Sequence, residues 1–378
     1  MARRAVAEVN LAAIERNTKQ LLSGLGPQTQ LWAVVKADGY GHGAVPAART
    51  ALSAGASGLA VATAGEAGEL RRAGISGPIL VLGAVSDEEL PVAVAADATL
   101  AVWDLRFVEL VRAAAAGAER PVNLHVKLDT GLGRLGTRAL GQALEVADAV
   151  RRAGPGLRLS GAMTHFATAD DDLEFAHRQL SVFDPLVDQL RSQPGGAELV
   201  IHAANSAGTL NLKGAHFDMV RTGIALYGGD PMNRDPADHG LEPALTLRSY
   251  VAAVKPIATG ESTGYGRRFI ADRESHIATL PIGYGDGLPR ALANNCDVLI
   301  GGHRYPLRGM VSMDNITVDI GPEPVVSVGE PATIIGVDGG ERQTAEDLAH
   351  RIGTINYEVF CWISKRVPRV YNRDGEPA

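Results

Sequence analysis

Short apolar runs alternate with amphipathic stretches along the first two thirds of the chain. The runs have the length of strands, and the stretches between them carry helix signals, such as Pro46 near a helix start, Ser86 and Glu89 as a capping box, and Gly154 at a helix end. Strands that alternate with helices predict a parallel sheet. The eight runs cover residues 31–35, 59–62, 79–82, 100–103, 122–128, 157–164, 199–204 and 220–227.

Eight strand–helix units over about 200 residues favour a closed barrel over an open, doubly wound sheet. The eighth run is followed by a loop, so the ring of helices lacks one member. A helix over residues 11–22, with Asn10 as its N-cap, can fill that place. The alternating run 5–9 before it has no barrel partner, and we expect it to pair with a second domain.

From residue 241 onward the pattern changes to strands and turns. The apolar runs lie at 245–254, 276–282, 298–300, 316–320 and 332–335, and two helices follow, one capped by Thr344 and one over 357–363. The predicted fold is an α/β barrel of the TIM type, with eight parallel strands, plus a C-terminal, mostly β domain. Its predicted parts are an N-terminal strand (1–9), the barrel (10–235) and the β domain (236–378).

Composition and charge narrow the class of partner. The chain has 378 residues, 46% of them hydrophobic, and a formal charge of −7, which disfavours nucleic acid or an anionic membrane. We find neither a bilayer-spanning stretch nor a signal peptide and expect a cytoplasmic location. Cys296 and Cys361 stand apart without CxxC spacing, and no metal site is predicted. A small-molecule substrate is therefore expected.

Lys36 is the most informative single residue, because it ends a buried strand and opens the glycine-rich loop ADGYGHG. An amine held away from water in this way can act as a nucleophile or base, and Schiff-base chemistry with a carbonyl cofactor is its usual use. Alternatively, the stem of Lys36 lies along the sheet and its amine reaches water. The local pattern leaves both interpretations open.

Polar residues also gather at the ends of the later barrel strands, where the active sites of such barrels lie. The fifth run leads into HVKLDTGLGR, the sixth ends in MTHF and the seventh in HAANS. The eighth run contains RTG at 221–223. The string GLGRLG at 131–136 matches the dinucleotide fingerprint GxGxxG. However, the next strand ends without an acidic residue for a ribose, and this unit is fifth in a series, so a dehydrogenase is disfavoured.

Several of these candidates also have simpler structural explanations. Lys127 and Arg134 can be surface charges around Asp129, and Tyr284 can be a core aromatic residue with a satisfied hydroxyl. We interpret the acidic run 170–172 as a helix-capping loop. A structural role is preferred for three histidines, His42, His125 and His202.

Nine motifs, in order along nearly the whole chain, resemble the alanine racemase family: KADGYGHG, KLDTGLGRLG, MTHF, HAANS, RTGIALYG, TGYGR, PIGYGDG, SMDN and TINYEV. The resemblance implies a homodimeric enzyme with shared active sites that uses pyridoxal 5′-phosphate to interconvert L- and D-alanine for peptidoglycan. Two alternatives stay open. One is a racemase for serine or a broader set of amino acids, and the other is a non-catalytic pyridoxal-phosphate carrier.

The resemblance further implies a role for each site residue. Lys36 would hold the cofactor and act as one base, and Tyr265 of the neighbouring subunit would act as the base on the opposite face of the substrate. Arg134 and the Met313 backbone would hold the substrate carboxylate, with support from Lys127. In some relatives the lysine at this position is carbamylated, and the sequence leaves open whether Lys127 is. Tyr284 would also face the substrate. The cofactor would be bound by Lys36, Tyr40, His165, Asn205, Ser206, Arg221, Gly223, Ile224 and Tyr357, with Arg221 donating to the pyridine nitrogen.

The chain departs from the family's common pattern at Met310 and Ser312, where relatives often have arginine and cysteine. The loss of a cation near the expected entrance could alter substrate capture or the range of amino acids accepted.

Overall fold

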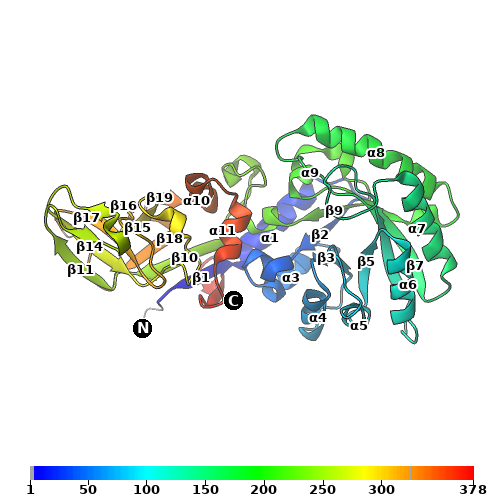
Figure 1. Cartoon of the computed structure of the whole chain (residues 1–378), viewed down its shortest axis with the longest axis horizontal. Coiled ribbons are helices and arrows are strands. Elements are labelled where there is room, and N and C mark those ends of the chain that lie inside the picture. The colour runs from blue at the N-terminus through cyan, green and yellow to red at the C-terminus, as the bar shows by residue number, and fades with distance from the viewer. Residues whose placement is uncertain (1–3, 324) are drawn as a thin grey trace. The chain divides into compact units, whose positions relative to one another are not determined.

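A computed structural model describes residues 4–323 and 325–378 (Figure 1). Residues 1–3 of the predicted N-terminal segment lie outside the described residues. The chain divides into two compact units. The barrel unit comprises Glu15–Gly39 and Ala44–Leu226, and the β unit comprises Met1–Ile14, Tyr40–Gly43 and Tyr227–Ala378.

Within the described residues, eight parallel strands close the predicted barrel in chain order. Every residue of β3 and β5 is buried, which is why such strands read as continuous apolar runs. The barrel strands are β2 (Gln30–Val34), β3 (Gly58–Val61), β4 (Ile79–Val81), β5 (Ala98–Val102), β6 (Val122–Lys127), β7 (Leu157–Met163), β8 (Val200–His202) and β9 (Met219–Thr222).

Helices follow the barrel strands and lie outside them (Figure 1). They are α3 (Ala44–Ser53), α4 (Ala64–Arg72), α5 (Leu90–Ala95), α6 (Leu105–Ala114), α7 (Leu140–Arg152), α8 (Leu173–Arg191) and α9 (Ser206–Asn211). The predicted N-terminal helix, α1 (Leu11–Ser23), begins where Asn10 Oδ1 accepts from Ala12 N at 3.0 Å. Asn17 Nδ2 donates to Leu226 O at 3.1 Å, so α1 lies against the segment that follows β9, as expected.

Two local predictions were wrong. The eighth run ends as a strand at Thr222 and continues as the 3₁₀ helix η3 (Ile224–Tyr227), because Gly223 N donates to the Ser206 hydroxyl at 2.9 Å rather than to a neighbouring strand. The capping box at Ser86 is half formed. Ser86 N donates to the Glu89 carboxylate, but the Ser86 hydroxyl donates to the same oxygen and α5 begins only at Leu90.

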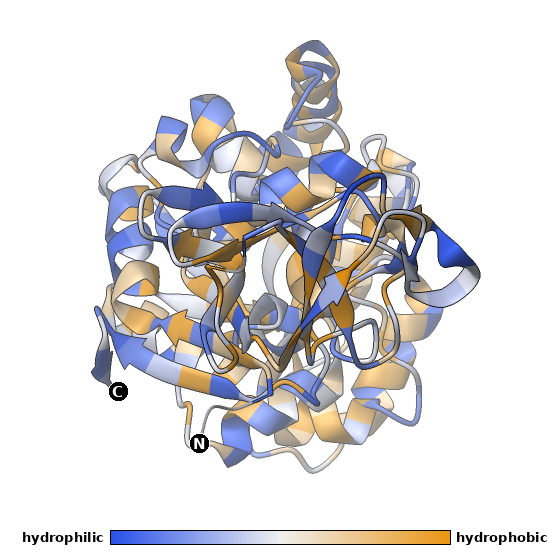
Figure 2. Ribbon diagram, turned by 90° about the vertical axis from the view of Figure 1, so that its left-hand side faces the viewer, coloured by the Kyte–Doolittle hydropathy of each residue, from blue (hydrophilic) through white to orange (hydrophobic). Residues whose placement is uncertain are grey.

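The described part of the β unit forms three sheets, in which hydrophobic and hydrophilic residues alternate along parts of the strands (Figure 2). In its largest sheet the order is β16-β15-β18-β10-β1-β20-β21, and β19 pairs with β18. These strands are β1 (Val6–Asn10), β10 (Leu245–Tyr250), β15 (Asp297–Ile300), β16 (His303–Pro306), β18 (Pro331–Asp338), β19 (Glu341–Gln343), β20 (Arg369–Arg373) and β21 (Glu376–Pro377). β1 pairs with β10 and β20, so the N-terminal strand joins the C-terminal sheet.

The predicted strand 245–254 is divided between two sheets. Val251 N donates to Glu330 O, and Ala252 N donates to Thr279 O, so the chain changes partners between these two residues. The second sheet contains β11 (Ala253–Ile257), β14 (Ser275–Leu280) and β17 (Ile316–Gly321), and the third contains β12 (Ser262–Thr263) and β13 (Phe269–Ile270).

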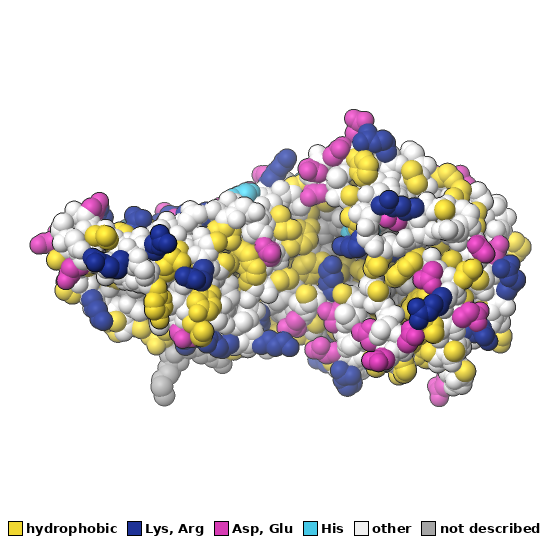
Figure 3. Space-filling view, in the orientation of Figure 1, with side chains coloured by type: hydrophobic (Ala, Val, Ile, Leu, Met, Phe, Trp, Pro, Cys, Tyr) yellow, Lys and Arg dark blue, Asp and Glu magenta, His cyan; other side chains and the backbone are white. Residues whose placement is uncertain are grey.

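The remaining elements of the chain are short helices. Thr344 and Asp347 form the capping box of α10 (Ala345–Ile352), which α11 (Asn356–Trp362) follows. The other 3₁₀ helices are η1 (Gly196–Glu198), η2 (Lys213–Ala215), η4 (Pro236–His239), η5 (Tyr265–Arg267) and η6 (Arg290–Leu292). None of the described helices combines the length and apolarity needed to cross a membrane. Basic and acidic side chains are interspersed on the face seen in Figure 3.

Candidate active site

Lys36 lies just beyond β2, at the start of the turn α2 (Lys36–Tyr40). The next four residues have left-handed backbone conformations, with φ of 51° at Ala37, 53° at Asp38, 62° at Gly39 and 52° at Tyr40. Each non-glycine residue in this region costs about 1–2 kcal/mol. Ala37 N donates to Glu66 Oε1 at 2.7 Å, which holds the turn from α4. Strain of this kind persists where the surroundings over-determine it and is concentrated at functional sites.

Arg221 on β9 is buried, and its guanidinium is held by the ends of two neighbouring strands. Nη1 lies 2.5 Å from His202 Nδ1. Nη2 donates to Thr164 O at 3.0 Å and Ala203 O at 2.9 Å, and lies 3.2 Å from His165 Nδ1. Nε, although buried, has no hydrogen-bond partner among the described residues. Burial lowers the pKa of Arg221 to about 9, so the group stays a cation at neutral pH.

His202 links Arg221 to a second histidine. Because Nδ1 of His202 accepts from the guanidinium, its Nε2 carries the ring proton and donates to His125 Nδ1, 2.7 Å away. Burial, together with the charge of Arg221, lowers the pKa of His125 to about 3 and that of His202 well below its usual value. The structure thus places His202, for which a structural role is preferred, in direct contact with the predicted site residue Arg221, a contact that the sequence interpretation did not include. The sequence did contain one indication of this contact, because His202 lies in the apolar run that precedes the run containing Arg221.

Lys127 is buried at the end of β6, so its interpretation as a surface charge was wrong. Burial lowers the pKa of Lys127 to about 8; the charges of Arg221, Arg134 and Lys36 act in the same direction, and Asp129 opposes them. Burial and the charges of Arg221, Lys127, Arg134 and Lys36 also hold the pKa of His165 well below its usual range. Four predicted cations and His165 therefore lie within electrostatic reach of one another. Arg134 itself is exposed.

The GxGxxG loop is wrapped around the Asp129 carboxylate and does not form a free binding site for an anion. Gly131 N and Gly133 N donate to Asp129 Oδ1 at 3.1 and 3.0 Å. Gly136 has φ of 121°, and a Cβ there would lie 2.8 Å from Asp129 N. The glycines thus serve a tight turn around Asp129, and two of the amides that a pyrophosphate would need are already bound.

Ser206, Gly223 and Ile224 lie together at the ends of β8 and β9. Ser206 Oγ accepts from Gly223 N at 2.9 Å, and both Ser206 and Ile224 are buried. Asn205 is the N-cap of α9, where its Oδ1 accepts from Gly208 N at 2.9 Å. The barrel unit therefore brings together this set of predicted phosphate ligands.

In the β unit, Tyr40 is buried between other aromatic rings. Its ring centroid lies 5.2 Å from that of Tyr227 and 6.1 Å from that of Tyr357, the other tyrosine predicted to bind the cofactor. Burial, followed by the charge of Cys361, raises the pKa of Tyr40, so its hydroxyl keeps its proton and can donate. His42 stacks on Tyr227 at 4.5 Å, a packing role of the kind preferred for it.

The three remaining predicted residues, Tyr265, Met313 and Tyr284, are 72%, 51% and 42% exposed on loops of the β unit. The interpretation of Tyr284 as a core aromatic residue was therefore wrong. Tyr284 N donates to Ser312 O at 2.9 Å, which joins two of these loops. A Cβ on Gly264, the residue before Tyr265, would lie 3.0 Å from Met310 N, so the third loop packs against the segment that contains Met313.

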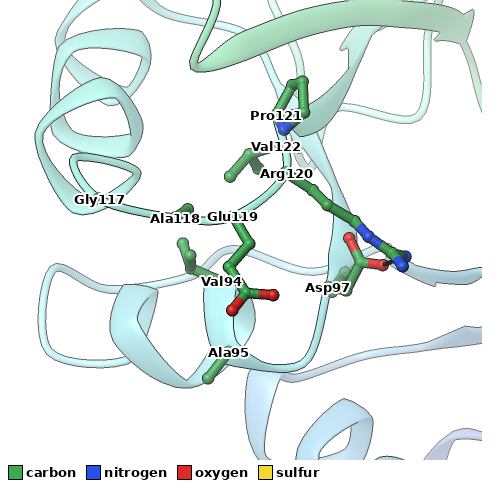
Figure 4. A pocket seen from close by; sticks show the side chains of 10 residues that line it. Val94, Ala95, Asp97, Gly117, Ala118, Glu119, Arg120, Pro121 and Val122 are labelled. Carbon is green, nitrogen blue, oxygen red and sulfur yellow. Dashed lines mark hydrogen bonds and ion pairs between the residues drawn. The ribbon is translucent and has the colours of Figure 1, made fainter.

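One surface pocket lies at the opposite end of the barrel from these strand ends (Figure 4). Its lining includes Ala98 and Val122, the first residues of β5 and β6. Arg120 Nη1 lies 3.1 Å from Asp97 Oδ2 there. Its lining includes no predicted site residue. In barrels of this type this end contributes stability rather than catalysis.

Comparisons with known proteins agree over the whole chain. The N-terminal and C-terminal domain models of alanine racemase match residues 9–231 and 244–371. The alanine racemase of Desulforamulus reducens is 42% identical over 369 residues, which are 97% of this chain and 98% of that protein. The crystal structure of the Streptomyces lavendulae enzyme matches with a TM-score of 0.93 and 38% identity and covers 98% of both chains. The Bacillus anthracis alanine racemase with bound L-Ala-P matches with a TM-score of 0.91 and 36% identity, over 100% of this chain and 97% of that one.

The barrel, the strand-end cluster and these matches define an amino-acid racemase from a group of enzymes that generally depend on pyridoxal phosphate. More particularly, the chain belongs to the alanine racemase family.

Proposed function

We propose that this racemase interconverts L-alanine and D-alanine in the cytoplasm, with Lys36 and Tyr265 as opposed bases, and that its D-alanine enters peptidoglycan. The observation that carries the proposal is the buried Arg221 guanidinium, fixed through both Nη atoms but with Nε left without a partner among the described residues. A buried donor in this state calls for an acceptor from a bound molecule.

The donor set fits pyridoxal phosphate. Nε of Arg221 would donate to the pyridine nitrogen, and His165, which lies 3.2 Å from Arg221 Nη2, would lie beside the ring. The phosphate would be bound by the Ser206 hydroxyl, which the Gly223 N–H orients, and by the N–H of Ile224, beside Gly223 and Asn205, with the hydroxyls of Tyr40 and Tyr357 as further donors. Lys36 Nζ would hold the cofactor covalently.

Inversion at the substrate Cα requires one base on each face, because the proton removed from one side must be replaced from the other. When bound, pyridoxal phosphate supplies the electron-withdrawing group that stabilises negative charge at Cα. Once the substrate amine has displaced Lys36 from the cofactor, the freed Lys36 Nζ would exchange the Cα proton on one face, and the Tyr265 hydroxyl would exchange it on the other. Arg221 remains protonated and cannot readily give a proton to the ring nitrogen, which we propose limits side reactions.

Arg134 and the Met313 N–H would hold the substrate carboxylate, with Lys127 in support. Lys127 stands among like charges, and with a pKa of about 8 roughly a tenth of its amine is neutral at pH 7. Only a neutral amine attacks CO₂, forming an N–C bond and releasing one proton, so Lys127 is suited to carbamylation. The resulting anion would offset the cations around it and orient Arg134.

Tyr265, Tyr284 and Met313 would complete the site of a second copy of this chain. Large side chains exposed together on adjoining loops are typical of an interaction surface. A head-to-tail homodimer with two shared sites would follow.

The test is the visible spectrum of the purified protein before and after addition of L-alanine, followed by chiral analysis of the product. We expect a coloured protein that forms D-alanine. A protein that cannot take up pyridoxal phosphate would contradict the proposal. Colour without D-alanine would instead favour another amino acid or a carrier, and L-serine is the control substrate that separates these two.

A further inference from the structure

Two arginines and two aspartates form a network behind the loops of the β unit that bear Tyr284 and Met313. We call Arg4, Asp286, Asp314 and Arg366 the arginine–aspartate cluster. Asp286, 1% exposed, is its centre and accepts from Arg4 Nη1 at 2.6 Å, Arg4 Nη2 at 2.9 Å and Arg366 Nε at 2.8 Å. Arg366 Nη2 also donates to Asp314 Oδ1 at 2.8 Å, and Arg4 Nη2 donates to Asp314 O at 2.9 Å. Two cations thus balance two anions and tie residues 286 and 314 together.

The cluster fixes the backbone on both sides of Tyr284. Asp286 Oδ2 accepts from Gly283 N at 2.8 Å. A Cβ on Gly283 would lie 2.2 Å from Ser312 O, and one on Gly285 would lie 2.9 Å from Arg366 Nη2. A side chain on Gly283 would therefore collide with backbone, and one on Gly285 would displace the Arg366 guanidinium from the cluster.

The same contacts determine how Met313 is presented. Gly285 N donates to Met313 O at 2.9 Å, and Arg366 Nη2 approaches the same oxygen at 3.5 Å. In contrast, the Met313 N–H donates to no acceptor within residues 4–323 and 325–378. The carbonyl side of this residue is held in place, while its donor remains available to a ligand.

Stability alone is a poor explanation for this arrangement. The pairs that Arg4 and Arg366 make with Asp314 join side chains that are 37%, 42% and 51% exposed, and exposed ion pairs of this kind contribute little to stability. The carboxylate of Asp286, the buried residue of the cluster, bonds to the loop that bears Tyr284 and, through the two arginines, to the loop that bears Met313, rather than to a sheet. Burial by itself would raise the pKa of Asp286, but the hydrogen bonds from Arg366, Arg4 and Gly283 outweigh it and lower that pKa, so the carboxylate stays charged.

We propose that the arginine–aspartate cluster positions Tyr284 and the Met313 N–H for the substrate carboxylate in the active site of the partner subunit. This inference rests on the proposed function and extends it to Arg4, which precedes β1, and to Arg366, which follows α11. Both are positioning residues that act through Asp286 and Asp314.

The first experiment replaces Arg366 with glutamine and measures racemisation of L-alanine. Contacts with the carboxylate act equally on bound substrate and transition state, so KM should rise about tenfold while kcat stays within about twofold. Arg342→Gln is the matched control, because Arg342 also pairs with an aspartate through two hydrogen bonds, to Asp235 at 2.9 Å, but outside these loops. It should leave KM unchanged.

The second experiment tests whether the effect acts across subunits. A hybrid dimer of one Arg366→Gln chain and one Lys36→Ala chain, isolated with two affinity tags, retains a single Lys36. Its site would be completed by the intact cluster of the Lys36→Ala chain, so KM should return to the wild-type value. A defect confined to the fold of the variant chain would keep KM raised.

Unchanged KM in Arg366→Gln, or a KM that stays raised in the hybrid, overturns the proposal. Should Arg366→Gln fail to dimerise, Arg4→Gln serves as the second variant, because Arg366 then still neutralises Asp286. A wild-type dimer that does not racemise alanine contradicts the proposed function itself, whereas racemisation without the hybrid rescue contradicts only the role of the cluster.

Discussion

Nη1 of Arg221 lies 2.5 Å from Nδ1 of His202, in a region that excludes water from both groups. A hydrogen bond between a guanidinium and a neutral imidazole orients the planar guanidinium as well as satisfying one of its donors. The partner of His202 on its other side, His125, fixes the ring of His202 in turn. The direction in which Arg221 Nε points is therefore determined by His202 and His125, together with the carbonyl groups of Thr164 and Ala203 that accept from Nη2.

Replacing His202 with leucine should weaken pyridoxal-phosphate binding and lower kcat, each about tenfold, because Arg221 loses an acceptor worth about 1.5 kcal/mol or more. Titration of the unloaded protein with cofactor, followed by absorbance, measures the affinity. His202→Asn, which keeps an acceptor near the position of Nδ1, is the control and should recover most of the loss. Equal defects in both variants would contradict a positioning role.

Replacing Arg221 with glutamate should increase transamination relative to racemisation. A carboxylic acid can protonate the pyridine nitrogen, whereas the buried guanidinium cannot readily do so. Pyruvate formed from L-alanine, counted per turnover of racemisation, is the measurement. An unchanged ratio of transamination to racemisation, in a variant that still binds the cofactor, would contradict the proposal that Arg221 limits transamination.

Lys127 should take up CO₂. Protein incubated with ¹³C-labelled bicarbonate near pH 8 is expected to show a carbamate signal in the NMR spectrum, because burial and neighbouring cations lower the pKa of this amine. The signal should be absent from Lys127→Arg and present in Lys213→Arg, which alters an exposed lysine. A spectrum without the carbamate signal in the wild-type protein would mean that Lys127 supports Arg134 as an amine.

The buried histidines should make the protein sensitive to mild acid. The folded-state pKa of His125 is about 3, below the unfolded value near 6.5, so between these values the unfolded chain binds more protons. The contribution of His125 to stability is therefore complete above about pH 6.5 and falls by about 1.4 kcal/mol per pH unit below it.

Thermal unfolding followed from pH 7 to pH 5 tests this sign. His125→Gln removes the titrating group, and its Tm should fall less steeply than that of the wild-type protein across this range, whatever its Tm at pH 7. Parallel slopes for the two proteins would show that His125 binds its proton equally in the folded and unfolded states, which contradicts a lowered pKa.

Mixed dimers of Lys36→Ala and Tyr265→Phe chains should regain activity. Each homodimer lacks one proposed base in both sites, whereas a hybrid contains one site with Lys36 from one chain and Tyr265 from the other. Up to about half of the wild-type kcat per dimer is expected, because one of two sites is complete. Verified heterodimers that remain inactive would rule out shared sites.

Much of the fold followed from the sequence because its signals are local. The burial of the barrel strands produced continuous apolar runs, and their number and spacing predicted the closed barrel. Asn10 and Thr344 marked helix starts correctly, since a capping side chain binds backbone only two or three residues away. Where a tertiary contact competed, local reasoning failed, as at Gly223, where the Ser206 hydroxyl ends β9 early.

The sequence by itself determined the alternation of strands and helices, and its ordered motifs indicated the family and the residues expected to act. Only the tertiary structure decided that Lys127 is buried among cations, that Asp129 occupies the amides of the GxGxxG loop, and that Arg221 bonds to His202. It also joined Arg4 to Asp286, which are 282 residues apart. The physical reason is that hydrogen bonding along the chain acts between near neighbours, whereas desolvation and charge pairing depend on which distant strands and loops come together.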